Sequence, residues 1–167
     1  MKVLIDSPAF NIGIFALMLS LPWELGQMWL YTASAQMLHL QGIRICMAAT
    51  AGDAVIMLIA FGVVALAARS RAWVRAPTMR QVSGFVAIGL VVTIAVEIVA
   101  TRSNGLFSWR YAPAMPVTPL FGVGFVPLLM WVVVPLLVLW FVRRQIAGGM
   151  TMPEVALRLR VPSEGQR

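Results

Sequence analysis

The chain has 167 residues, of which 60% are hydrophobic and only 11% are charged. A soluble domain carries about 25% charged residues, so this composition excludes an ordinary water-soluble fold and predicts that lipid surrounds most of the surface. The formal net charge of +7 does not indicate nucleic-acid binding, because no aromatic interleaving or fold signature of such proteins accompanies the basic residues.

Four apolar stretches are long enough to cross a membrane as helices, each of which needs about 20 mainly apolar residues. They are Ala9–Tyr31, Ile43–Ala68, Val82–Thr101 and Phe121–Val142. A helix satisfies its own backbone hydrogen bonds, as lipid requires. The sequence therefore predicts an all-α fold: a four-helix transmembrane bundle over residues 1–145, followed by a basic tail over residues 146–167.

Basic residues gather before the first span, between the second and third spans, and after the fourth. They are Lys2, Arg69, Arg71, Arg75, Arg80, Arg143, Arg144, Arg158, Arg160 and Arg167. Lysine and arginine accumulate in short loops on the cytoplasmic side of a membrane. We therefore expect a multi-pass protein of the bacterial inner (cytoplasmic) membrane, with both termini in the cytoplasm.

The first span carries two polar side chains in its outer half, Glu24 and Gln27. Their spacing of three residues places them on one face of a helix. A charged side chain at the middle of a membrane helix costs about 2.5–3.5 kcal/mol. Glu24 should therefore face the interior of the bundle and have a partner there.

The second span presents a polar stripe at the same depth. This stripe consists of Cys46, Thr50, Asp53 and Met57. Because the span runs back toward the cytoplasm, Asp53 lies in its outer half, near the level of Glu24. His39 and Arg44 lie at the outer start of this span, where we expect them to cap the polar group.

The third span places Thr93, Glu97 and Thr101 on one stripe, with Glu97 near the outer end. It is followed by a long outer loop with four candidate ligand-binding residues: Arg102, Trp109, Arg110 and Tyr111. Three prolines in this loop recur at every third position, which favours a polyproline II segment of three residues per turn. They are Pro113, Pro116 and Pro119. We expect this loop to lie across the mouth of the bundle.

These features predict one outward-facing polar pocket with an apolar floor, to which the fourth span adds Trp131. The first candidates for proton transfer are Glu24 and Glu97, followed by Asp53 and His39. The candidates for ligand binding are Gln27, Arg44, Arg102, Trp109, Arg110, Tyr111 and Trp131. A single cysteine, a single histidine and eleven methionines show no ligand spacing, so we predict no metal site and no cofactor.

Three functions fit this pattern. In the first, the pocket binds a lipid or an isoprenoid. This function extends to transforming the ligand by acid/base chemistry, because a carboxyl group in apolar surroundings can donate a proton at neutral pH. Alternatively, the carboxylates pair with Arg44 or Arg102, and the protein is an accessory or assembly subunit of a larger respiratory or photosynthetic complex. The third function is proton-coupled transport by a homo-oligomer.

Several motifs resemble a family of small, uncharacterised bacterial four-span inner-membrane proteins. They are Pro22-Trp23-Glu24-x-x-Gln27, His39, Cys46, Gly52-Asp53, Glu97-x-x-Ala100-Thr101-Arg102, Trp109-x-Tyr111-Ala112-Pro113-Ala114-Met115-Pro116 and Gly122-Val123-Gly124 before Pro127-Leu128. The resemblance covers about Phe10–Arg144 and implies the four-span architecture. A fainter similarity is to membrane carotenoid-modifying enzymes of the lycopene cyclase or carotenoid hydratase type, which combine few intramembrane carboxylates with aromatic residues and prolines in outer loops.

Overall fold

The computed structural model describes residues 7–33, 37–104 and 108–160, with side chains placed up to residue 148. Within these residues, four long helices account for most of the structure. They are α2 (Pro8–Gln27), α3 (His39–Ala67), α4 (Met79–Arg102) and α5 (Phe125–Arg160). All four are long and apolar enough to cross a membrane. The all-α, four-helix transmembrane bundle predicted from the sequence is confirmed.

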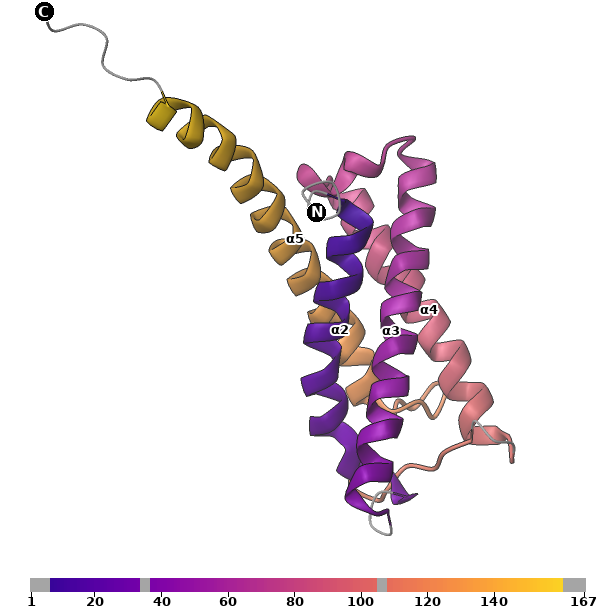
Figure 1. Ribbon diagram of the computed structural model, residues 1–167. Helices are drawn as coiled ribbons and strands as arrows, with labels where there is room; N and C mark the ends of the chain where they lie inside the picture. The colour runs from indigo at the N-terminus through magenta and orange to yellow at the C-terminus, as the bar shows by residue number, and fades with distance from the viewer. Residues whose placement is uncertain (1–6, 34–36, 105–107, 161–167) are drawn as a thin grey trace, which may run out of the picture.

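The four helices form an antiparallel ring. α2 and α4 each pack against both α3 and α5, so helices that follow one another in the chain are neighbours and the last closes onto the first (Figure 1). The start of α2, the short helix η3 (Arg71–Arg75) and the far part of α5 lie at one end, which we call the basic end. Residues 28–33, 37–38, 103–104 and 108–124 lie at the other end, which we call the loop end.

Local capping explains where the helices begin. α2 starts with Pro8 directly after Ser7, and proline at the first helical position is already restricted to a helical φ. α4 starts with a capping box, in which the Gln81 N–H donates to the Thr78 hydroxyl and the Thr78 N–H donates to the Gln81 side chain. These reciprocal bonds satisfy two donors that a helix start otherwise leaves open.

The apolar core fills the middle of the bundle and its basic end. η3 belongs to this core rather than to a loose loop, because Trp73 and Val74 are buried. The Trp73 ring lies 5.9 Å from the rings of both Phe61 and Phe85. Deep in the bundle, Trp131 of α5 packs directly against Gly89 of α4. The carboxyl groups of the spans, Glu24, Asp53 and Glu97, lie outside this apolar core.

Helix α5 is longer than a membrane crossing needs. Its 36 residues extend about 54 Å at a rise of ~1.5 Å per residue, whereas the hydrocarbon layer is about 30 Å thick. The helix passes residue 145, where we placed the boundary between bundle and tail, and continues to Arg160. Its far part projects away from the other helices (Figure 1).

The loop before α5 consists of turns, so the prediction of a polyproline II segment is wrong. Backbone N–H groups between the prolines make hydrogen bonds, which a polyproline II helix lacks. Met115 donates to the Ala112 carbonyl at 3.0 Å, and Thr118 donates to the Val123 carbonyl at 2.8 Å. Gly122 has a φ of +67°, a left-handed conformation that favours glycine. The loop is therefore compact and fixed in shape.

Candidate functional site

Three helices each bring one carboxyl group to the interior of the loop end. Glu24 comes from α2, Asp53 from α3 and Glu97 from α4. Glu97 is buried, with 5% of its surface exposed, and the other two side chains are half-buried. Glu24 and Asp53 lie close enough to interact electrostatically with each other and with Glu97. Three neighbouring helices thus each contribute one carboxyl group to a single polar cluster.

Tyr31, which directly follows the first span, faces all three carboxyl groups. Burial raises the pKa of its phenol above the ordinary value, and the negative charges of Glu97, Glu24 and Asp53 raise it further. The phenol therefore stays protonated and remains a hydrogen-bond donor at neutral pH. Sequence reasoning did not place this residue in the site, although its position at the outer end of the predicted first span was the available signal.

Glu97 anchors the loop between α4 and α5 through two side-chain hydrogen bonds. Its Oε2 atom accepts a hydrogen bond from the Trp109 indole N–H at 3.0 Å and another from the Tyr111 hydroxyl. The Tyr111 oxygen in turn accepts the backbone N–H of Gly124 at 2.9 Å. Burial, followed by the hydrogen bond to Glu97, raises the pKa of Tyr111 above its ordinary value. The two aromatic residues are thereby fixed over the carboxyl group.

The loop is also joined to the segment that follows α2. The Thr32 N–H donates to the Arg110 carbonyl at 3.0 Å, and the Ala112 N–H donates to the Leu30 carbonyl at 2.8 Å. These bonds bring three aromatic rings together: the Tyr31 ring lies 6.5 Å from Trp109 and 5.8 Å from Tyr111. We call Glu24, Asp53, Glu97, Tyr31, Trp109 and Tyr111 the carboxyl–aromatic cluster.

Glu24 is positioned by its own helix and by α3. The Gln27 side-chain N–H donates to Glu24 Oε1 at 2.7 Å, as the spacing of three residues predicts. The Cys46 thiol lies 3.7 Å from the Glu24 backbone carbonyl and 3.7 Å from the Met28 sulfur. Glu24 therefore has a fixed backbone and a side chain with one neutral partner.

Several buried polar atoms near the cluster have no hydrogen-bond partner in the part of the chain that the structure describes. They are Trp23 Nε1, Gln27 Oε1, Thr50 Oγ1, Asp53 Oδ2 and Thr93 Oγ1. The Ser20 hydroxyl lies beside the Asp53 carboxyl group, which can accept a hydrogen bond from it. Ser20, Thr50 and Thr93 are each more than nine-tenths buried. Native proteins leave few such groups, and this concentration comes from the same three helices that carry the carboxyl groups.

The other predicted site residues lie elsewhere. His39 is the first residue of α3 and is exposed. The three nearby arginines, Arg44, Arg102 and Arg110, are also exposed. Arg110 donates to the Asn104 side chain at 3.5 Å. Among the described residues, the side chains bonded to Glu97 are Trp109 and Tyr111, and neither is an arginine. Trp131 is part of the apolar core below the cluster.

Among the described residues, no three histidine, cysteine, aspartate or glutamate side chains are arranged to hold a metal ion.

Comparison of the chain with protein-family models, with curated proteins and with solved structures found no match.

Cys46 offers a simple test of this end of the bundle, because it is the only cysteine and has 3% of its surface exposed. A membrane-permeant maleimide should label the folded protein at least about tenfold more slowly than the detergent-denatured chain, since reaction requires local opening. Labelling is followed by intact mass. Equal rates in the two states would show that α2 and α3 do not pack as described.

Proposed function

We propose that this integral membrane protein binds the polar end of a lipid or isoprenoid at the carboxyl–aromatic cluster. The observation that carries the proposal is the set of buried polar atoms around Asp53 that have no hydrogen-bond partner among the described residues, which includes Asp53 Oδ2, Thr50 Oγ1 and Thr93 Oγ1. An unpaired buried polar group costs about 1–3 kcal/mol. A ligand that supplies hydrogen bonds there would recover this free energy.

The cluster favours a ligand group that is positively charged or that becomes positively charged when it is protonated. The nearby arginines, Arg44, Arg102 and Arg110, are exposed, and the side chains bonded to Glu24 and Glu97 among the described residues are neutral. Negative charges crowded together repel one another, and a proton or a cationic group relieves that repulsion. The rings of Tyr31 and Trp109 add an attraction between their π faces and a cation.

The three carboxyl groups have different roles in this proposal. Glu97 is engaged by the loop, whereas Asp53 Oδ2 is unpartnered among the described residues and Glu24 has only Gln27 as a side-chain partner. Asp53 and Glu24 are therefore the groups that meet the ligand. If one donates a proton to a ligand double bond and the other removes a proton from the adjacent carbon, the double bond moves and no proton is gained or lost.

The distribution of basic residues supports an orientation for this site. Six arginines lie at the basic end: Arg69, Arg71, Arg75, Arg80, Arg143 and Arg144. By the positive-inside rule this end faces the cytoplasm. The carboxyl–aromatic cluster then lies in the outer half of the membrane and takes its ligand from the outer leaflet.

The proposal is tested by purifying variants in mild detergent and measuring co-purified small molecules by mass spectrometry. Asp53→Asn and Glu24→Gln should each lower the amount of bound ligand about tenfold or more, since a hydrogen bond to a charged group contributes about 1.5–3 kcal/mol. Arg44→Gln is the control, because Arg44 is exposed on the same helix as Asp53.

Two results would count against ligand binding. Equal ligand in all variants would show that the carboxyl groups do not hold it. A preparation without a small molecule that instead brings down other membrane subunits would favour the accessory role, with the carboxyl groups serving only the packing of the bundle.

A further inference from the structure

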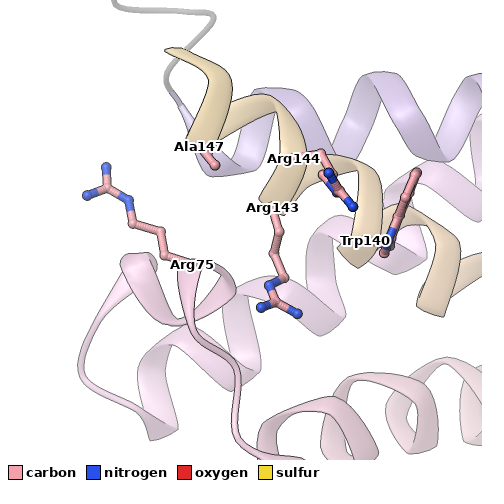
Figure 2. A pocket seen from close by; sticks show the side chains of 5 residues that line it. All are labelled: Arg75, Trp140, Arg143, Arg144 and Ala147. Carbon is pink, nitrogen blue, oxygen red and sulfur yellow. The ribbon is translucent and has the colours of Figure 1, made fainter. Parts of the chain in front are cut away.

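A second candidate site lies at the basic end, far from the carboxyl groups. A hollow of about 430 Å³ is lined by Arg75, Trp140, Arg143, Arg144 and Ala147. Figure 2 shows that Arg75 comes from the short helix η3, whereas the other four residues come from α5. Two separate elements of the fold thus contribute three arginine side chains to the lining of one hollow, and their guanidinium groups point in different directions.

The bundle holds both elements in position. Trp73 and Val74 anchor η3 in the apolar core, which fixes Arg75 at the end of that helix against α5. On α5, Val142 and Ile146 are buried. Their burial fixes the rotation of the helix, so that Arg143, Arg144 and Ala147 are exposed toward the hollow. The site is therefore part of the folded bundle.

The positive charge of this hollow is not neutralised by a described carboxylate. Within residues 7–33, 37–104 and 108–148 the carboxylates are Glu24, Asp53 and Glu97, and all three belong to the carboxyl–aromatic cluster. Arg144 stacks on Trp140, with 5.2 Å between its guanidinium carbon and the ring centroid. The three arginines give the lining of the hollow a positive charge, so an anion bound there is attracted to each of them.

The depth of the hollow matches the lipid headgroups. The segment from Phe125 to Val142 rises about 27 Å along the helix, close to the hydrocarbon thickness of about 30 Å. Arg143 and Arg144 therefore leave the hydrocarbon at the level of the headgroups. Trp140, just below them, is of the residue type that prefers this boundary.

We propose that this hollow binds the phosphate headgroup of an anionic phospholipid. The planar guanidinium group matches two phosphate oxygens at once, and basic pockets between membrane helices on the cytoplasmic side bind such headgroups. An acyl chain of the same lipid would lie along the exposed apolar surface of α5, to which Leu136 and Leu137 belong. This proposal is independent of the one for the carboxyl–aromatic cluster.

Native mass spectrometry of the full chain, titrated with short-chain phosphatidylglycerol or phosphatidylcholine, tests the site. Phosphatidylglycerol should bind more tightly than phosphatidylcholine. This preference should fall about fivefold for Arg143→Gln and about 25-fold for Arg75→Gln combined with Arg143→Gln. Arg80→Gln is the matched control, since Arg80 is exposed in the first turn of α4 and does not line the hollow. Slow Cys46 labelling verifies that each variant is folded.

The outcomes separate the two sources of phosphate. Inorganic phosphate should compete only weakly, because it lacks acyl chains to contact α5. If inorganic phosphate binds as well as the lipid does, the site is one for free phosphate and the lipid proposal is wrong. Equal binding of the two lipids, or a double variant that binds like the unchanged protein, would also overturn it.

Discussion

Replacing Gly89 by alanine should destabilise the bundle by about 3 kcal/mol, at the upper end of the cost of overpacking a core. A Cβ atom at this position would lie 2.1 Å from Cε3 and 2.2 Å from Cζ3 of Trp131. Trp131 has 1% of its surface exposed, so its ring has no free space into which it can move. α4 and α5 would have to separate.

The matched control for this substitution is Gly62→Ala on α3. Nothing lies within 4 Å of a Cβ atom built on Gly62, and alanine is the better helix former by about 1 kcal/mol. Denaturation by SDS, followed by Cys46 labelling, measures both variants. Trp131→Leu should restore part of the stability lost by Gly89→Ala. If Gly89→Ala and Gly62→Ala unfold at the same SDS concentration, the close packing of α4 on α5 is wrong.

Removing the carboxyl group of Glu97 should release the long loop. Glu97→Ala leaves the Trp109 N–H and the Tyr111 hydroxyl without their acceptor, at a cost of about 1–3 kcal/mol for each group. Hydrogen exchange followed by mass spectrometry should then show faster exchange of the amides of Thr32 and Ala112, whose bonds join the loop to the end of α2. Exchange within α5 should be unchanged.

Two further variants separate the hydrogen bonds from the charge. Glu97→Gln keeps an acceptor oxygen and should release the loop less than Glu97→Ala does. Tyr111→Phe removes both the bond to Glu97 and the acceptor for the Gly124 N–H, so it should raise exchange at Gly124 as well. Unaltered loop exchange in Glu97→Ala would mean that Glu97 does not hold the loop.

The sequence predicts the bundle well because lipid imposes strong constraints on it. A helix that crosses the membrane needs a long apolar run, and each predicted span corresponds to a helix. The depth of Glu24, Asp53 and Glu97 follows from the alternating direction of the spans. Their common face follows from the period of the helix, since a polar side chain in a span turns away from lipid.

The partners of the carboxyl groups are not predictable in the same way. Arg44 and Arg102 lie at the outer ends of their spans, close to the level of the carboxyl groups, and this suggests ion pairs. A long arginine side chain at a span end can instead extend to water and keep its hydration. The bonds from Trp109 and Tyr111 depend on the folded shape of the loop. That shape depends on turns such as the one at Gly122, which proline spacing does not reveal.

The position of Trp131 depends on how α5 is rotated, and an almost wholly apolar span gives little indication of its rotation. The glycine that accommodates the ring, Gly89, lies on another helix and has no side chain to mark it. The hollow at the basic end likewise needs the three-dimensional placement of η3 beside α5. From the sequence alone, Arg75 and Arg143 are two of the basic residues that predict the cytoplasmic side of the membrane.

Native mass spectrometry of the protein, released from its own membrane in mild detergent, tests ligand binding at the carboxyl–aromatic cluster most directly. We expect a bound small molecule on the unchanged protein and on Arg143→Gln, and its loss from Asp53→Asn. Retention by Arg143→Gln distinguishes this ligand from a phospholipid at the basic end. The bare polypeptide mass for the unchanged protein, or equal retention by Asp53→Asn, would contradict the proposed function.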